Sequence, residues 1–352
     1  MATTARESGG GKAGGLVSLF CGAGGLDLGF EEAGFRVAVA VDLRGQSINS
    51  YNHNRTAAVG HVADVRKLAP ARLDRLANLW LYPAGIIGGP PCQSFSRAAH
   101  STEDDDRHDL PLEFARILRA FNRRSQVSFF MFENVPGLLK KKHKNRYDNI
   151  LRTFKTAGFS VRAELLNASS FGVAQDRPRL IVVGFNKDLY PGLEWTPPPS
   201  SGEAPLTVKN VIGGLREPKY WERGLDLESI PVHPNHWCMV PRSKNFTTPG
   251  ALVQGTARGR SFRTLDWKQL SPTIAYGNRE VHIHPTGRRR LSVYEALLLQ
   301  GFPKEYALLG SLSAQISQVS EAVPPPLARA VAMSIKQDLE RYRVPGQNRK
   351  AA

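Results

Sequence analysis

Short apolar runs alternate with segments of helical periodicity over the first half of the chain. Runs of five or six largely apolar residues predict buried strands at 16–20, 37–41, 85–89, 127–132 and 180–185. Apolar residues at helical spacing predict helices at 26–33, 46–52, 70–79, 112–121 and 147–157. Continuous apolar runs are typical of strands that helices cover on both faces. The pattern therefore predicts a doubly wound α/β fold around a parallel sheet.

The regular alternation ends after Phe185. A proline-rich stretch follows at 191–205, and helical spacing returns only at 292–300 and 326–340. These changes predict four parts: a disordered N-terminus (1–15), an α/β domain (16–187), a smaller and irregular domain (188–304), and a C-terminal segment that rejoins the first domain (305–345).

The charge of the chain narrows the class of partner. The 352 residues carry a net charge of +16, which predicts a polyanionic partner, with nucleic acid as the leading candidate.

The three cysteines are too few and too widely spaced for a disulfide framework or a Cys-based zinc site. We therefore expect a reducing compartment and no metal. No apolar run approaches the roughly 18 residues of a membrane span, so a cytoplasmic protein without a membrane partner is expected.

A glycine-rich turn follows the first predicted strand. Gly22, Gly24 and Gly25 lie between that strand and a helix, where backbone N–H groups can approach a ligand closely. Asp42 ends the next strand, at the position where nucleotide-binding folds place an acceptor for ribose hydroxyls. The combination indicates a nucleoside cofactor without identifying it. The alternative is a tight turn beside a solvated aspartate.

Two more strand ends carry reactive groups. Cys92 follows the third predicted strand in a turn restricted by Gly and Pro, and Glu133 comes just after the fourth. Because the carboxyl ends of parallel strands meet at one edge, we expect these two side chains to be neighbours. The alternative for a lone cysteine is a small buried hydrophobe. In QDRPR, Arg177 and Arg179 alternate and should share one face of a strand, where they suit a base, a carboxylate or a phosphate.

Five blocks in this order resemble the DNA cytosine-5 methyltransferases of bacterial restriction-modification systems. The blocks are FCGAGG, PPCQSFS, FENVPGLL, QDRPR and RRLSVYEALLLQGFP, and the likeness runs from about residue 16 to residue 331. The resemblance implies a Rossmann-like domain of the class I S-adenosylmethionine-dependent type, joined to a smaller target-recognition domain.

The resemblance also implies roles for individual residues. Cys92 resembles the nucleophile, Glu133 the residue that faces N3 and the exocyclic amine of cytosine, and Arg177 and Arg179 groups that position the base and Glu133. It implies that S-adenosylmethionine contacts Phe20, Gly22, Gly24, Gly25, Asp42, Leu43, Asp64, Val65, Pro91 and Leu110. It implies that DNA contacts Gln93, Ser96, Arg97, Gln175, Thr273 and Ile274.

The implied reaction is methyl transfer to C5 of a cytosine in a short duplex sequence. The physical logic agrees, because a thiolate that adds to C6 makes C5 nucleophilic. The stacked base must first swing out of the duplex. The implied partners are double-stranded DNA and a restriction endonuclease that acts on the same site without a stable complex, and a monomer is expected.

Two local features stay open at this stage. Ser320 and Glu321 stand where the family usually has Gly-Asn, and a carboxylate there could alter the affinity for the cofactor. The stretch 139–146 (LKKKHKNR) is either a contact to DNA phosphates or a solvated surface turn.

Three other functions compete with this interpretation. An RNA cytosine-5 methyltransferase would share the catalytic domain, although the CFT signature of the tRNA-modifying relatives is missing. A catalytically silent DNA-binding homologue is disfavoured because Cys92, Glu133 and Arg177 are all present. A nucleotide-dependent oxidoreductase would explain the glycine-rich turn but not PPCQ, ENV and the basic second domain.

Overall fold

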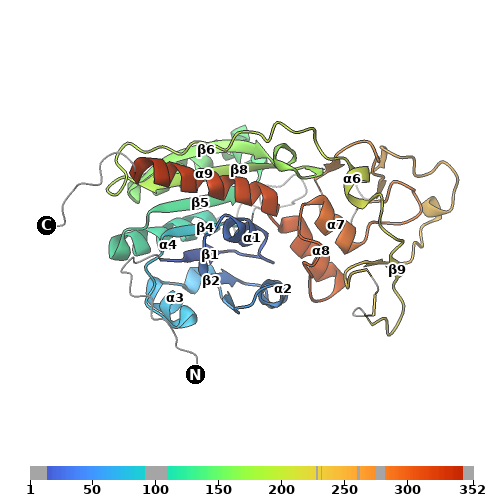
Figure 1. Ribbon diagram of the computed structural model, residues 1–352, viewed down its shortest axis with the longest axis horizontal. Helices are drawn as coiled ribbons and strands as arrows, with labels where there is room; N and C mark the ends of the chain where they lie inside the picture. Colours follow the sequence, from blue (N-terminus) through green and yellow to red (C-terminus); the bar gives the residue numbers. More distant parts are fainter. Residues whose placement is uncertain are drawn as a thin grey trace, which may run out of the picture.

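The computed structural model describes residues 14–91, 109–226, 229–230, 232–259, 262–273 and 282–343. Almost all of the N-terminus that is predicted to be disordered lies outside these residues. Within them, seven strands form one sheet in the order β3-β2-β1-β4-β5-β8-β6 (Figure 1). The strands are β1 Leu16–Leu19, β2 Val37–Asp42, β3 Gly60–Val62, β4 Gly85–Gly88, β5 Phe129–Asn134, β6 Phe159–Asn167 and β8 Pro178–Asn186.

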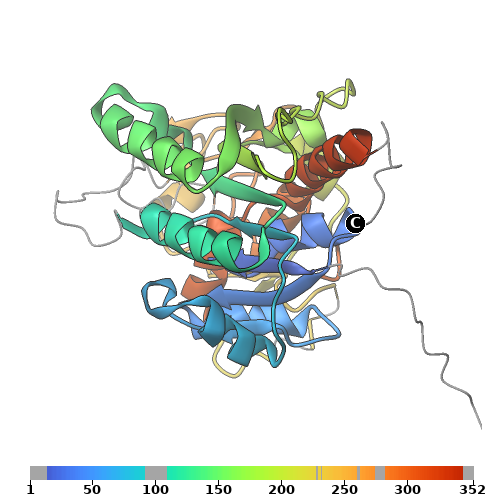
Figure 2. The same cartoon turned by 90° about the vertical axis from the view of Figure 1, so that its left-hand side faces the viewer.

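Helices cover both faces of this sheet, as Figure 2 shows. One side carries α1 and α9, and the other carries α3, α4 and α5. The described helices are α1 Gly25–Glu32, α2 Gly45–His53, α3 Pro70–Ala77, α4 Leu110–Ser125, α5 Lys144–Thr156, α6 Val208–Ile212, α7 Val293–Leu299, α8 Leu312–Glu321 and α9 Pro325–Arg343. The predicted α/β class is therefore confirmed.

The two-sided burial explains why the strands are apolar throughout. In β5, Phe130 and Phe132 pack with Phe114 and Phe154 under α4 and α5, whereas Phe129 and Met131 face α1 and α9. Successive strand residues point to opposite faces, so a strand covered on both sides needs apolar residues at every position.

One strand does not run in the predicted direction. β8 is antiparallel to both β5 and β6, so the sheet is mixed rather than parallel. The apolar run that predicts β8 reports burial on two faces, and this burial is the same for either direction.

The hydrophobic pattern of the sequence does not predict β3, β6, α6 or α8. β3 is only three residues long, and β6 is half-buried along most of its length, so it lacks a continuous apolar run. α6 is short. α8 buries Gln315 and Gln318, whose amides donate to the carbonyls of Gly310 and Leu309. A helix whose buried face includes hydrogen-bonded amides does not give an apolar stripe.

The segment between β8 and α7 contains little regular structure. Its strands are pairs of two residues: β9 Lys219–Tyr220 with β10 Trp237–Cys238, and β11 Ala257–Arg258 with β12 Phe262–Arg263. A third pair joins β13 Ser271–Pro272 to β7 Gln175–Asp176, which ties this segment to the entrance of β8. The irregularity agrees with the sequence prediction, whereas the predicted domain boundaries stay a prediction.

At Gly29, α1 packs directly against the backbone of α9. A Cβ built on Gly29 would lie 2.5 Å from the carbonyl oxygen of Pro325 and 2.5 Å from the backbone nitrogen of Arg329. Both atoms belong to backbone that cannot move without shifting α9. The close approach keeps the C-terminal helix on the sheet.

We expect Gly29→Ala to lower the free energy of unfolding by about 1–3 kcal/mol, because the added methyl group must push two helices apart. Urea denaturation followed by far-ultraviolet circular dichroism measures this change. Gly214→Ala is the matched control, since a Cβ there meets no atom within 4 Å. Equal midpoints for the two variants would contradict the packing argument.

Candidate active site

The carboxyl ends of β1, β2, β4 and β5 lie along one edge of the sheet, because these strands run parallel. The turn 22–25 follows β1, Asp42 ends β2, Pro91 follows β4, and Glu133 lies near the end of β5. The predicted cofactor half and the predicted catalytic half therefore share one edge. Among the candidates, Cys92, Gln93, Ser96, Arg97 and Ile274 lie outside the described residues.

The turn after β1 has an open outer side. Phe20 and Gly22 have φ angles of 58° and 54°, in the left-handed region that glycine tolerates and that strains a residue such as Phe20. A Cβ built on Gly22 would meet no atom within 4 Å. The N–H of Gly22 donates to Oδ2 of Asp42 at 3.0 Å, which joins the turn to the end of β2.

Asp42 and Leu43 together fit a nucleoside. Asp42 also accepts a hydrogen bond at Oδ1 from the N–H of Arg44 at 2.9 Å, so each carboxylate oxygen keeps a lone pair for a further donor. The next side chain, Leu43, is 63% exposed. An acceptor beside an exposed apolar surface is what a ribose and its base require.

Arg44 connects this strand end to α8. Its guanidinium pairs with the carboxylate of Glu321, and its Nε lies 3.8 Å from Oδ1 of Asp42. Glu321, which stands where the family usually has Asn, is therefore paired with the positive charge of Arg44.

The remaining predicted cofactor residues differ in their surroundings. Asp64 accepts hydrogen bonds from the backbone and the guanidinium of Arg66, and these bonds lower the pKa of Asp64. The side chain of Val65 is buried in the core beneath α4. Leu110, at the start of α4, and Pro91 are half-buried.

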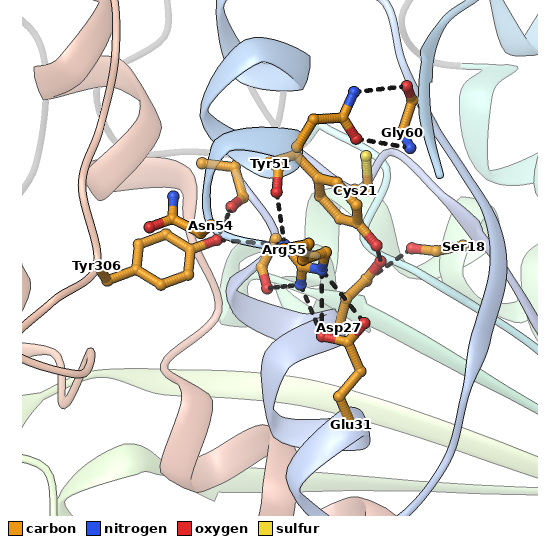
Figure 3. A network of polar contacts seen from close by, with 12 residues as sticks. Ser18, Cys21, Asp27, Glu31, Tyr51, Asn54, Arg55, Gly60 and Tyr306 are labelled. Carbon is orange, nitrogen blue, oxygen red and sulfur yellow. Dashed lines mark hydrogen bonds and ion pairs between the residues drawn. The ribbon is translucent and has the colours of Figure 1, made fainter. Parts of the chain in front are cut away.

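A buried polar network lies beneath the glycine-rich turn (Figure 3). Asp27 of α1 is fully buried and accepts hydrogen bonds from the hydroxyls of Ser18 at 2.7 Å and Tyr51 at 2.8 Å. The guanidinium of Arg55 lies 3.7 Å from the ring centroid of Tyr51 and pairs with Glu31 at 2.9 Å. Burial raises the pKa of Asp27 to about 6, against the opposing effects of Arg55 and the two hydroxyls.

Two side chains of this network hold carbonyl groups of the turn. Arg55 donates to the carbonyl of Gly24 at 3.3 Å, and the hydroxyl of Tyr306 donates to the carbonyl of Ala23. Tyr306 is itself fixed, because Asn54 exchanges two hydrogen bonds with the backbone of the next residue. The turn is therefore held from its inner side, and its outer side is available to a ligand.

Glu133 is a buried carboxylate beside the end of β4. It is 8% exposed, and its Oε1 lies 2.8 Å from Nε of Arg179. Burial raises the pKa of Glu133, and Arg179 and Arg177 oppose this effect. A Cβ built on Gly89 would lie 2.6 Å from Oε2 of Glu133, so the glycine lets the two strand ends meet. The chain then passes Pro90, whose carbonyl accepts from the amide of Asn134.

Arg177 and Arg179 have different partners. Arg177 is fully buried, and its Nη2 donates to the carbonyls of Ser320 and Ala322 rather than to Glu133. Gln175, for which the resemblance implies a DNA contact, is also fully buried, and its Oε1 accepts from Arg177 at 3.4 Å. Thr273 donates its hydroxyl hydrogen to the carbonyl of Asp176 at 2.6 Å, which fastens the end of β13 to the same segment.

Sequence reasoning missed the network around Asp27. The signal was an acid on the apolar face of the helix predicted at 26–33, where Leu26, Asp27 and Phe30 are all buried. A carboxylate in such a place needs partners. Its partners Tyr51, Arg55 and Tyr306 come from distant segments with no shared motif.

Two further kinds of feature are missing from the part of the chain that the structure describes. There, no group of three His, Cys, Asp or Glu side chains is arranged to hold a metal ion, and no helix is long and apolar enough to cross a membrane.

The structure is an α/β fold whose sheet edge places the candidate nucleoside residues Gly22 and Asp42 on the same edge as the buried acid Glu133. A family model described as C-5 cytosine-specific DNA methylase matches residues 15–337. The Type II methyltransferase M.FnuDI of Fusobacterium nucleatum is 33% identical over 346 residues, which cover 92% of this chain and 94% of the relative. M.NgoPII of Neisseria gonorrhoeae is 31% identical over 365 residues, with coverage of 93% and 96%.

A solved structure has the same fold. A prophage-encoded E. coli protein described as a DNA modification methyltransferase superposes with a TM-score of 0.76 at 23% identity, over 93% of this chain and all of that one. The chain belongs to the C-5 cytosine-specific DNA methylase family. It is a DNA cytosine-5 methyltransferase with S-adenosylmethionine as the methyl donor, and the residues around Asp42 fit that cofactor.

We expect Tyr306→Phe to weaken S-adenosylmethionine binding by about 2–10-fold, because the loss of one hydrogen bond to Ala23 loosens the turn. Isothermal titration measures the dissociation constant, and kcat at saturating cofactor should not change. Tyr190→Phe is the matched control, since it removes a hydroxyl that bonds to Ser128 under α9. Equal constants for the two variants would contradict this role of Tyr306.

We expect Asp27→Asn to change how stability depends on pH. The pKa of Asp27 rises from 3.8 in the unfolded chain to about 6 in the folded one, so the folded state binds more protons between these values. The contribution of Asp27 to the free energy of unfolding therefore falls as pH rises through this window, by about 3 kcal/mol. Urea titrations at several pH values should show this decline in the wild type, with a shallower one in Asp27→Asn. Parallel curves would contradict the assignment.

Proposed function

We propose that the chain methylates C5 of a cytosine that has swung out of a specific short duplex sequence, through a transient bond between Sγ of Cys92 and C6. The observation that supports this most is the buried pair of Glu133 and Arg179 beside the end of β4. Gly89 touches Glu133, and Cys92 follows it closely in sequence. A thiol nucleophile that acts together with a buried acid suits addition to a pyrimidine ring.

The steps conserve atoms and electrons. The thiolate of Cys92 adds to C6, and the electron pair of the C5–C6 bond moves into the ring, towards N3. S-adenosylmethionine, when bound, would supply the methyl group: its sulfonium–methyl bond would break with the electron pair left on sulfur, while the electron pair at C5 forms the new bond. A base or a water molecule then takes the proton from C5, and the returning electron pair expels the thiolate of Cys92.

Glu133 stabilises the charge that develops at N3. Its raised pKa favours a carboxyl group that donates a hydrogen bond to N3, and the exocyclic amine of cytosine can donate to its other oxygen. Arg179 fixes the orientation of Glu133 through Oε1. Arg177 acts as a positioning residue, because it joins the start of β8 to the backbone at Ser320 and Ala322.

Target reading is assigned to residues 188–304, and residues 16–187 and 305–345 form the catalytic part. In the irregular segment the side chains of Arg242, Lys244, Arg258 and Arg263 are exposed, which supports contact with phosphates and base edges. Gln93, Ser96, Arg97, Thr273 and Ile274 are proposed to complete the DNA contacts.

The biological setting follows from the relatives. M.FnuDI and M.NgoPII are named as Type II methyltransferases. We infer that this chain protects cytoplasmic host DNA from a restriction endonuclease that acts on the same sequence, and that it works as a monomer.

Cys92→Ala should reduce methyl transfer to the background of the assay while it leaves DNA binding intact, because the substitution removes only the nucleophile.

Glu133→Gln should lower kcat by about 10²–10⁴-fold, since the amide cannot give a proton to N3. Transfer of tritiated methyl groups to genomic duplex DNA measures both effects.

Cys238→Ala is the matched control. Cys238 is buried in β10, and burial raises the pKa of its thiol to about 12, which leaves it protonated and unreactive. The control should retain transfer. Full activity of Cys92→Ala would refute the nucleophile assignment, and preferential methylation of tRNA over duplex DNA would favour the RNA-modifying alternative.

A further inference from the structure

The segment after Glu133 carries charge that the proposed reaction does not use. Lys140, Lys141 and Lys142 are exposed, and within the described ranges none of them forms an ion pair. Their backbone is nevertheless ordered by hydrogen bonds, from the N–H of Lys140 to Gly137 at 3.2 Å and from that of His143 to Lys140 at 2.8 Å. The three lysines therefore lie on a turn whose backbone is fixed by hydrogen bonds.

This turn leads into the amino end of α5, where positive charge is unfavourable. The aligned peptide dipoles give a helix a partial positive charge at its amino end, so acids stabilise that end and cations destabilise it. The first turn of α5 contains no acid, and no side chain caps it. Lys144 is offset by Asp148 at 2.6 Å, but the three preceding lysines are not offset in this way. Such a local conflict is typical of a surface selected for binding.

The position of the turn points to the ligand. It follows the carboxyl end of β5, the strand that carries Glu133, and therefore lies on the sheet edge where a target base must enter. A pocket of about 470 Å³ lies between the amino end of α4 and α5, the helix that follows this turn, and Arg146 and Arg152 line it together with Asp109. Several cations at the entrance of a base-binding site suit the phosphates that flank that base.

We propose that Lys140, Lys141 and Lys142 bind the phosphate backbone of the duplex that carries the target cytosine. The inference rests on the proposed function, because it takes the DNA to lie across the edge that holds Glu133. Lysine is a compact point charge on a flexible stem, so these side chains add affinity without sequence preference. They hold one strand while the irregular segment reads the sequence.

The test compares two triple variants that remove the same charge. K140A/K141A/K142A removes the three lysines, and R36A/K155A/K187A removes three exposed cations from the opposite edge of the sheet. Fluorescence anisotropy with a mixed-sequence duplex gives the binding constant over a range of salt concentrations. Methyl transfer to genomic DNA gives KM and kcat.

We expect the lysine variant to bind DNA with a weaker salt dependence, with the slope of log K against log salt reduced by about 0.9 for each phosphate that is no longer neutralised. KM for DNA should rise at least about 10-fold at low salt, with kcat unchanged. The thermal midpoint should equal or exceed that of the wild type, because cations leave the amino end of α5. The control should keep the wild-type slope and KM.

The possible outcomes separate the two proposals. If the wild type transfers no methyl group to duplex DNA, the proposed function fails. If the wild type is active and the lysine variant keeps the full slope and KM, the role of the lysines fails and the function stands. A variant that binds duplex DNA normally but loses affinity for a tRNA competitor would assign this surface to RNA and overturn the inference.

Discussion

Hydrogen bonds to one C-terminal stretch hold the two halves of the site together. Tyr306 holds the turn after β1, Arg44 pairs with Glu321, and Arg177 donates to the carbonyls of Ser320 and Ala322. The cofactor half and the start of β8 are therefore fastened to residues more than a hundred positions away in the chain. The strands supply the edge, but the geometry of the site requires the C-terminal segment to be docked on it.

Two buried acids lie at or beneath this edge, and their burial costs free energy. A carboxylate such as Glu133 loses its hydration on burial, and a single ion pair with Arg179 offsets the loss only in part. Asp27 is in the same position, with two hydroxyl donors and a nearby guanidinium. Apolar residues would stabilise both places at lower cost. The proposed function gives Glu133 a role that an apolar residue could not fill, toward the target base, and Asp27 binds the hydroxyl of Tyr51 in the network that holds the glycine-rich turn.

The sequence predicts strands well where burial on both faces makes every position of the strand apolar. β1, β2, β4 and β5 are apolar because helices cover both faces, and this signal is local. The direction of β8 is decided by its connection to β6, which the run 180–185 does not encode. β6 and α8 were missed for a related reason. Most positions of β6 are only half-buried, and two buried positions of α8 are hydrogen-bonded amides, so neither element has a continuous apolar signal.

A count of Lys and Arg residues in the sequence does not show which of them are exposed to solvent. The stretch 235–290 contains ten Lys or Arg, yet Arg289 is 2% exposed and pairs with Glu295 and Glu217, so its charge does not reach a partner. The lysines at 140–142 are fewer, but all three are exposed, and they follow the end of β5, the strand that carries Glu133. Interaction with a polyanion depends on the charge that faces solvent near the site rather than on the total of a segment. The proposed DNA surface therefore includes these lysines as well as the segment with the larger count.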